Sequence, residues 1–424
     1  MKQYNNPPKS EWENLSKRPV LDAENLEELV QEIIDEVLRN GDKAVKDFAL
    51  KFDNVALENF KVSEEEMELA SSEISASLKK AISVASANIR KFHDSQKISE
   101  PIVETMKGVT CWRKSLPIRS VGLYIPGGSA PLFSTILMLG IPAQIAGCKK
   151  IILCTPCDEK EKINPAILYT ASTLGISEIY KIGGAQAISA MAYGTQTIPK
   201  VDKIFGPGNQ YVTKAKELVQ KTGVAIDLPA GPSEVLVIAD KNCDPGFVAS
   251  DLLSQAEHGA DSQVVLVTND TTLPERVNQS IIQQLKILPR ENIAEKALEN
   301  SFAVVLNSIE ECFDFSNVYS PEHLIVAVDQ AENYIDKIQN AGSVFLGNYT
   351  CESAGDYASG TNHTLPTNGY ARSYSGVSLD SFVKKITFQN ITKDGLQNIG
   401  ETIETMAEAE QLTAHKNAVS IRLK

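Results

Sequence analysis

The stretch VGLYIPGGSAPLFSTILMLGIPAQIAGCKKIILC, residues 121–154, decides the fold class. Its two ends, VGLYI (121–125) and KIILC (150–154), are apolar runs with the length of buried strands. The apolar segment between them, residues 130–146, is interrupted by polar residues, glycine and proline. A membrane span needs about 20 mostly apolar residues, so this segment is expected to be a buried helix. A strand, a helix and a second strand in this order predict parallel strands covered by helices.

The same alternation continues along most of the chain. The runs EIYKI (178–182), KIF (203–205) and VAI (224–226) complete a first series of strands. A second series is expected at VLVIA (235–239), QVVLVT (263–268), AVVL (303–306), LIVAV (324–328) and SVFLG (343–347). Two series in one chain predict two α/β domains, and no repeat of 20–50 residues suggests a solenoid.

The two ends of the chain depart from this rhythm. Residues 1–24 are expected to be an extended arm, because Pro7, Pro8 and Pro19 interrupt regular structure. Residues 25–88 show a helical pattern with Asn25 as a plausible N-cap. From about Ser373 the strand rhythm is lost, and a helical, acidic tail is expected.

Composition and charge exclude several classes of protein. A chain of 424 residues suggests two to three domains. The formal net charge of −13 would repel a phosphate backbone, so nucleic acid is not expected as a partner. Seven scattered cysteines suit reduced thiols in a cytoplasm. The first residues lack the apolar core of a secretory signal, so we expect a soluble cytoplasmic protein without a membrane segment.

Three glycine-rich turns follow expected strands of the first series. They are Pro126-Gly127-Gly128, Gly183-Gly184-Ala185-Gln186 and Gly206-Pro207-Gly208-Asn209. Such turns bring backbone amides to a helix N-terminus, where a phosphate is stabilised. None contains the dinucleotide fingerprint GxGxxG, and each alone could be a tight turn and nothing more. Because all three lie within residues 119–232, together they favour one shared ligand cleft.

Polar segments of the second half carry most of the histidines. In SQAEHGADSQ (254–263), Gln255 and His258 would share one face at the end of a helix running from Asp244-Pro245 to Gly259. Such a face could bind an ion, or it could be a solvated helix end. In SPEHL (320–324), Glu322 and His323 could divide general acid–base work, although the dipeptide is common.

Two further segments add oxygen and nitrogen donors. The loop GDYASGTNHTLPT (355–367) contains Asp356 and His363, and the tail EAEQLTAHKNA (408–418) contains Glu410 and His415. A mixed set of Gln255, His258, Asp356 and His415 is compatible with Zn²⁺, and also with Mn²⁺ or Co²⁺. Solvated polar surface is the alternative for the loop and the tail. The pair Cys154 and Cys157 has no second CxxC and is interpreted as structural thiols.

These motifs together resemble the histidinol dehydrogenase family from about residue 20 to the end. The strings that carry the resemblance are RSVGLYIPGG (119–128), KIGGAQAISAMAYGT (181–195), VDKIFGPGNQYVTKAK (201–216), DLPAGPSEVLVIAD (227–240), DLLSQAEHGADSQ (251–263), SPEHL, GDYASGTNHTLPT and LTAH (412–415). One departure is Gln411, where glycine is common before LTAH.

The resemblance implies a reaction and a site. The reaction would be the oxidation of L-histidinol through L-histidinal to L-histidine with two NAD⁺, in the last steps of histidine biosynthesis. The residues that the family implies are the Zn²⁺ ligands Gln255, His258, Asp356 and His415, with one ion per subunit; the acid–base pair Glu322 and His323; the NAD-binding Tyr124, Gln186 and Asn209; and the substrate-facing Ser233, His323, His363 and Glu410 together with the metal ligands.

The resemblance also implies an architecture. The fold would be α/β, with two incomplete Rossmann-like domains related to the aldehyde dehydrogenase fold. We divide the chain into an N-terminal arm (1–24), a metal and substrate domain (25–118 with 234–370), an NAD-binding domain (119–233) and a helical tail (371–424). The tail would be exchanged in an intertwined homodimer, so that His415 and Glu410 complete the partner's active site.

Two alternatives remain open at this point. A zinc- and NAD-dependent relative could oxidise another small alcohol, although Glu410 and Ser233 argue against an altered imidazole pocket. A noncatalytic metal-binding or scaffolding protein is the other, although it would not need both Glu322 and His323.

Overall fold

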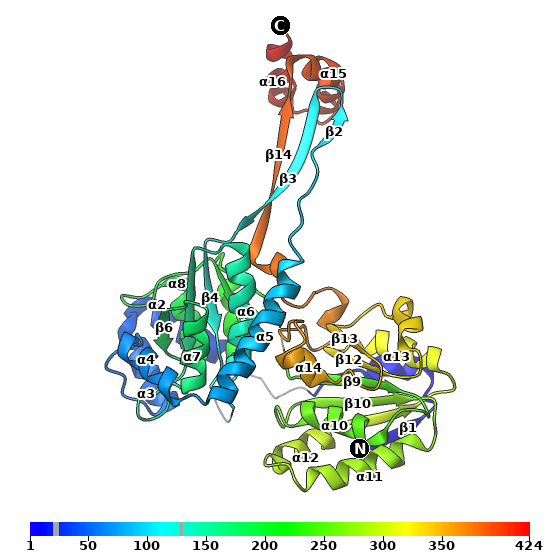
Figure 1. The fold of residues 1–424 in the computed structure, drawn as a ribbon. Helices are drawn as coiled ribbons and strands as arrows, with labels where there is room; N and C mark the ends of the chain where they lie inside the picture. The colour runs from blue at the N-terminus through cyan, green and yellow to red at the C-terminus, as the bar shows by residue number, and fades with distance from the viewer. Residues whose placement is uncertain (20–24, 128–129, 230) are drawn as a thin grey trace.

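The computed structural model describes residues 1–424 except 20–24, 128–129 and 230. Two α/β bodies lie side by side, and a long arm projects from them with the C-terminus at its tip (Figure 1). Each body contains one parallel sheet with helices on both faces, and the arm contains an antiparallel sheet.

The first body is built on a six-stranded sheet in which every pairing is parallel. Its order is β1 (Lys2–Asn5), β11 (Phe302–Val305), β10 (Gln263–Thr268), β9 (Glu234–Ala239), β12 (His323–Ala327) and β13 (Ser343–Leu346). Alternate residues of a strand point to opposite faces, and here both faces are apolar. One face packs on α10 (Pro245–Ala256), α11 (Leu273–Leu285) and α12 (Glu291–Glu299), and the other on α1 (Lys9–Leu15), α13 (Ile309–Tyr319) and η1 (Ala331–Lys337).

The second body has a five-stranded parallel sheet. Its order is β6 (Glu178–Lys181), β5 (Lys150–Thr155), β4 (Ser120–Tyr124), β7 (Lys203–Phe205) and β8 (Ala225–Ile226). One face packs on α2 (Leu26–Asn40), α3 (Asp42–Asp53), α8 (Gly184–Tyr193) and α9 (Gln210–Gln220). The other packs on α4 (Glu64–Glu73), α5 (Ala76–Asp94), α6 (Phe133–Ala146) and α7 (Pro165–Thr173).

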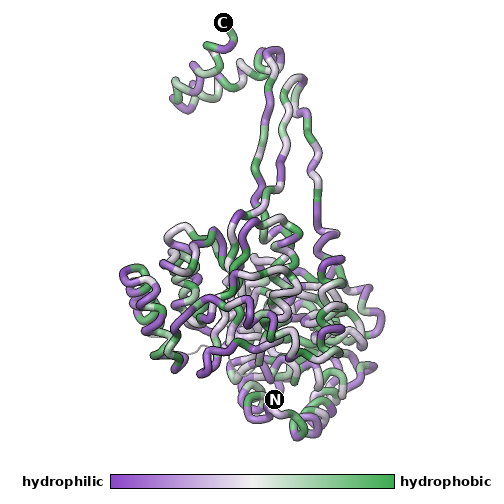
Figure 2. Tube along the Cα trace, turned by 60° about the vertical axis from the view of Figure 1, so that its left-hand side comes forward, coloured by the Kyte–Doolittle hydropathy of each residue, from purple (hydrophilic) through white to green (hydrophobic). Residues whose placement is uncertain are grey.

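The arm combines residues that are distant in the sequence. Its sheet has the order β14 (Val383–Ile391), β3 (Val109–Pro117) and β2 (Val103–Met106), and all pairings are antiparallel. The helices α15 (Lys393–Ala409) and α16 (Thr413–Leu423) pack on each other at its tip. Hydrophilic and hydrophobic residues are mixed along the arm, and neither of the two α/β bodies packs against its length (Figure 2). The short elements α14 (Glu352–Tyr357), η2 (Tyr370–Arg372) and η3 (Leu379–Phe382) belong to the segment that leads to the arm.

The predicted α/β class and its ten strands are confirmed. Asn164 accepts a hydrogen bond from Ala166 N–H at the start of α7, and Gly175 follows the end of that helix with φ +65°. The window 130–146 contains the buried helix α6. Among the described residues, no helix combines the length and the apolarity that a bilayer crossing requires. Asn25 precedes α2 without making a side-chain cap.

Three of the expected boundaries were wrong. Residues 2–5 form a strand on the sheet edge and residues 9–15 a helix, so the described part of 1–24 is no extended arm. The segment 25–118 does not belong with 234–370, because α2 to α5 bury their apolar faces on the sheet of 120–226. The tail 371–424 is helical only in part, since it contributes the nine-residue strand β14.

The N-terminal segment contributes to the core through Trp12. Its side chain is buried, its ring contacts Phe315 edge-on at 5.5 Å, and its Nε1–H donates to Pro7 O at 3.0 Å. We therefore expect Trp12→Ala to lower the free energy of unfolding by about 3–5 kcal/mol, as for other buried aromatic truncations. Denaturant unfolding followed by circular dichroism measures the change, and the exposed neighbour Glu13 provides the control Glu13→Ala. Equal stabilities of the two variants would contradict the packing role of this segment.

Candidate active site and metal centre

The predicted polar segments converge at the amino-terminal edge of the six-stranded sheet. His323 is the first residue of β12 and pairs with Val235, the second residue of β9. Gln255 lies in the last turn of α10, and His258 lies two residues beyond the end of that helix rather than on its last turn. A crossover helix returns the chain to the edge where the next strand begins, which explains why these residues meet there.

Glu322 and His323 are both buried, and both lie within hydrogen-bond distance of Glu234. Glu322 Oε2 accepts the Glu234 N–H at 2.9 Å, and Glu322 N–H donates to Glu234 Oε1 at 3.2 Å. His323 Nδ1 lies 3.3 Å from Glu234 O. Because a carbonyl oxygen can only accept, we assign the proton of the neutral ring to Nδ1. His323 Nε2 is then the nitrogen that is free to accept a proton.

Three carboxylates surround the His323 ring. Nδ1 is 3.6 Å from Glu322 Oε2 and 3.9 Å from Glu352 Oε1, and Nε2 is 3.5 Å from Asp356 Oδ1. Burial by itself would lower the pKa of His323, but the negative charges of Glu322, Glu352 and Asp356 outweigh it and raise the pKa well above its ordinary value. Burial also raises the pKa of Glu352 well above the usual range.

A cluster of ligand atoms suits a metal ion. One donor atom each of His258, Glu352 and Asp356 lie within 4.8 Å of one another. Within the described residues, the buried atoms Asp356 Oδ1 and His323 Nε2 have no hydrogen-bond partner. A buried group of carboxylates with an unsatisfied oxygen lacks positive charge, and nitrogen and oxygen donors suit Zn²⁺ or a similar divalent ion. The residues present therefore fit a bound cation.

The structure adds Glu352 to the predicted set and changes the position of Gln255. In the amide orientation that satisfies both of its ends, Gln255 donates to Glu352 Oε1 and accepts from Glu234 N–H at 3.3 Å. Gln255 thus borders the donor cluster through Glu352. Glu352 was not among the predicted residues, although Glu352 and Asp356 are four residues apart, the spacing that puts two carboxylates on one face of a helix.

His363 and Ser233 flank this cluster. His363 Nδ1 lies 2.9 Å from Asp356 O, and Nε2 lies 3.1 Å from Thr135 Oγ1 of α6. Burial lowers the pKa of His363, in keeping with a neutral ring that donates to the carbonyl and accepts from the hydroxyl. This contact joins the two bodies next to the site. Ser233 is half-buried and directly precedes Glu234 at the same sheet edge.

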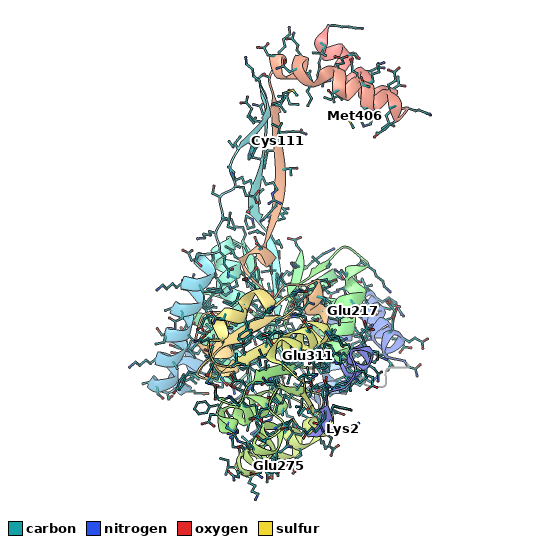
Figure 3. The ribbon with its side chains drawn as sticks, turned by 90° about the vertical axis from the view of Figure 1, so that its right-hand side faces the viewer. Lys2, Cys111, Glu217, Glu275, Glu311 and Met406 are labelled. Atoms are coloured by element: carbon teal, nitrogen blue, oxygen red, sulfur yellow. The ribbon has the colours of Figure 1, made fainter. Side chains whose placement is uncertain are left out.

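Glu410 and His415 are not brought to this cluster within one chain. Both are exposed and follow α15 or begin α16 at the tip of the arm. Figure 3 shows these helices, marked by Met406, standing well away from the two bodies. The set Gln255, His258, Asp356 and His415 is therefore only partly assembled in a single chain.

A second site lies at the carboxyl ends of β4, β5 and β6 in the other body. A pocket of about 1360 Å³ is lined there by Tyr124, Gln186 and Asn209, and each of the three glycine turns contributes at least one lining residue. Gly128 of the first turn lies outside the described residues. Typical ligand pockets hold about 300–1,000 Å³, so this one suits a long ligand such as a dinucleotide. The position also agrees with the rule that α/β sheets bind ligands beyond their carboxyl edge.

Local hydrogen bonds fix two of the three predicted cofactor residues, Tyr124 and Asn209. Tyr124 OH accepts the Gly184 N–H at 3.0 Å at the start of α8, and burial raises the pKa of Tyr124 to about 12. Asn209 Oδ1 caps α9 by accepting the N–H groups of Tyr211 and Val212. Gln186 is buried in the first turn of α8.

The remaining features of this region are structural. Gly206 has φ +131°, and a Cβ there would lie 2.0 Å from Tyr124 O, so the turn requires glycine. Cys154 and Cys157 are free thiols. Burial raises the pKa of both, to about 11 for Cys157, which supports their interpretation as unreactive.

Comparisons with known proteins agree with one another. Residues 16–423 match the family profile described as histidinol dehydrogenase. The histidinol dehydrogenase of Bacteroides thetaiotaomicron is 56% identical over 426 residues, which cover 100% of this chain and 99% of the relative. The histidinol dehydrogenase of Yersinia pestis is 53% identical over 412 residues, which cover 96% of this chain and 92% of that relative.

Solved structures include a similar protein of the same description. The crystal structure of histidinol dehydrogenase from Elizabethkingia anophelis has a TM-score of 0.98 and 62% identity, covering 100% of this chain and 98% of that chain. An acetylating aldehyde dehydrogenase from Geobacillus thermoglucosidasius has a TM-score of 0.49 and 14% identity.

The donor cluster predicts that His258 holds a divalent ion. We expect His258→Asn to weaken Zn²⁺ binding by at least about 10–100-fold, because even indirect losses around a metal have effects of that size. Equilibrium dialysis against buffered Zn²⁺ measures binding without any assay of activity. Glu257→Gln changes the adjacent residue outside the cluster and serves as the control. Stoichiometric, tight Zn²⁺ in His258→Asn would remove this residue from the ligand set.

Proposed function

The chain belongs to the histidinol dehydrogenase family and is an oxidoreductase that acts on histidinol in histidine biosynthesis, and we propose how its own residues carry out that reaction. Two NAD-dependent oxidations convert L-histidinol through L-histidinal to L-histidine. The observation that carries the proposal is the buried pair Glu322–His323 beside a donor cluster for a cation. Formation of NADH from histidinol, with and without a chelator, tests it.

The two alternatives are not favoured. An identity of 56% over the whole chain joins it to relatives named for histidinol rather than for another alcohol. The same similarity disfavours a noncatalytic scaffold. We further propose a cytoplasmic enzyme that binds neither nucleic acid nor membrane, in keeping with its formal charge of −13.

We propose that Gln255, His258 and Asp356, with His415 of a second chain, hold one Zn²⁺ per subunit. When bound, the ion would fix the substrate's position close to His323. Glu352 is buried within the same cluster. A dication bound beside it would favour loss of its proton, and its carboxylate would then contribute the further negative charge that retains the ion. Ser233, His363 and Glu410 would face the substrate around this centre.

The pocket with Tyr124, Gln186 and Asn209 is proposed to hold NAD. When bound, NAD⁺ accepts one hydride in each of the two oxidations. The first turn of α8 lines this pocket and offers backbone N–H groups to a phosphate, although GxGxxG is absent. Tyr124 OH and the Asn209 cap keep the mouth of the pocket in shape through their bonds to α8 and α9.

The two residues of the pair would divide the proton transfers. His323 Nε2, which lacks a hydrogen-bond partner among the described residues, would take the hydroxyl proton of the alcohol. A cation bound beside Glu352 and Asp356 would offset the negative charges that raise the pKa of His323, and so would favour the neutral ring that this step needs. The Nδ1–H bond to Glu234 O would orient the ring for this step. The Glu322 carboxylate would remove a proton from the water that attacks the aldehyde. As the water adds, the protonated His323 would return its proton to the aldehyde oxygen, which gives the diol and a neutral ring. The diol then loses the second hydride, and His323 takes its hydroxyl proton.

Glu322→Gln is expected to separate the two oxidations. An amide cannot deprotonate water, so oxidation of histidinal should fall about 10²–10⁴-fold, the usual size of a general-base effect. Oxidation of histidinol to the aldehyde should fall much less. Single-turnover NADH formation from each substrate measures the difference, and the exposed Glu310→Gln is the matched control. Equal losses on both substrates would argue against activation of water by Glu322.

The arm suggests how His415 and Glu410 reach an active site. It carries exposed apolar side chains, among them Met406 (61% exposed) and Ile421 (69%), and it stands away from its own bodies (Figures 1 and 3). Apolar surface of this kind typically marks a contact with another chain. We propose an intertwined homodimer in which the arm of each chain completes the site of the other.

Complementation between two inactive chains tests the shared site. His323→Ala and His415→Ala chains are coexpressed with different tags, and the mixed dimer is isolated by two affinity steps. One of its sites then carries both lesions and the other is intact, so activity should return to about half of wild type. The two parental homodimers, purified in the same way, set the background. Activity of the mixed dimer at that background would show that each tail serves its own chain.

A further inference from the structure

Arg18 and Glu234 form a buried ion pair behind the Glu322–His323 pair. Their side chains are only 6% and 1% exposed. Arg18 Nε donates to Glu234 Oε2 at 2.5 Å, and Arg18 Nη2 donates to Glu234 Oε1 at 2.8 Å. A two-point contact of this kind fixes the plane of the carboxylate, because the guanidinium is itself rigid and planar.

Two reciprocal hydrogen bonds connect Glu234 to Glu322, so the orientation of one carboxylate depends on that of the other. The oxygen that Arg18 Nη2 contacts, Glu234 Oε1, also accepts the backbone N–H of Glu322. In return, the Glu322 carboxylate accepts the backbone N–H of Glu234. The carbonyl of Glu234 accepts from the ring of His323. Glu234 therefore contacts both members of the pair without itself reaching the donor cluster through its side chain.

Arg18 also holds the turn that precedes the pair. Its Nη2 donates to Tyr319 O at 2.8 Å, and its guanidinium lies 3.5 Å from the centre of the Tyr319 ring. The next residue, Ser320, has φ +57°, a left-handed conformation that a non-glycine residue adopts only when its surroundings impose it. Arg372 supports the same turn, since its Nε donates to Ser320 Oγ at 3.0 Å. Pro321 and Glu322 follow directly.

We propose that Arg18 is a positioning residue for the reaction, acting through Glu234 on Glu322 and His323. This inference rests on the proposed roles of that pair. Arg18 contacts neither the donor cluster nor the cofactor pocket, so it acts through the geometry of the pair alone. Lysine keeps the charge but has no planar fork and so cannot hold Glu234 at two points.

The test is Arg18→Lys in the full-length enzyme. We expect a folded protein in which kcat falls about 10–100-fold, because misplacement of a catalytic group by about 1 Å has an effect of that size. KM for histidinol and Zn²⁺ content should stay close to wild type, because the ligands are untouched. Lys9→Met is the matched control. It removes a second cation of the N-terminal segment, one that pairs with Asp314 of α13 on the surface, and it should leave kcat unchanged.

A second pair of variants separates positioning from stability. Arg18→Met leaves a buried, unpaired charge on Glu234 and should lower the free energy of unfolding. The double variant Arg18→Met/Glu234→Gln removes that charge as well and should recover most of the lost stability. If Arg18 positions the pair, the double variant is stable but keeps the low kcat. A double variant with wild-type kcat, or Arg18→Lys with wild-type kcat, would overturn the proposal. Full activity of Glu322→Gln on both substrates would instead refute the proposed function of Glu322.

Discussion

Burying a carboxylate without a counter-charge is strongly unfavourable, and this chain gathers Glu234, Glu322, Glu352 and Asp356 at the edge of one sheet. Arg18 pairs with Glu234, and His323 lies among the other three. The four carboxyl groups thus outnumber Arg18 and His323, the two basic side chains that they pair with. This imbalance explains why the residues around His323 suit a dication and why an unsatisfied oxygen of Asp356 faces the cluster.

The two bodies use opposite edges of their sheets. The large pocket of the second body lies at the carboxyl edge, where backbone amides of helix starts are available. The charged cluster of the first body lies at the amino edge, where the C-terminal end of α10 and the loop before β12 converge. Reaction between a bound cofactor and a substrate held at the cluster requires the two edges to face each other. The hydrogen bond between Thr135 of one body and His363 of the other lies at that junction.

The sequence predicted local structure well and distant pairing poorly. Buried parallel strands such as β5 and β10 are continuous apolar runs, so their positions could be identified without knowledge of their neighbours. Strand β14 could not, because it has no apolar run and its pairing with β3 joins residues 266 to 282 positions apart. The same limit applies to the first strand, β1, whose partner is β11.

The site shows the same division. His258, His323 and Asp356 could be selected by residue type and motif, and the structure brings them together. Glu352 was missed because its four-residue spacing from Asp356 matters only if both lie on one helix, and the sequence was interpreted as a loop there. Arg18 was missed because its role depends on burial against Glu234. Gln411 stands where glycine was expected, yet it has φ +60°, the conformation that favours glycine.

The arm is the part of the fold whose apolar side chains a single chain leaves largely uncovered. A three-stranded sheet needs an apolar face packed on something to be stable by itself. Here the apolar contacts within the arm are few, such as the stacking of Trp112 on Phe388, and Phe388 and Ile391 remain partly exposed. The long β14–β3 ladder gives the arm length and direction rather than a core. Such an element is stable only when a second surface covers it, and in the proposed dimer that surface belongs to the chain whose active site the tip of the arm completes.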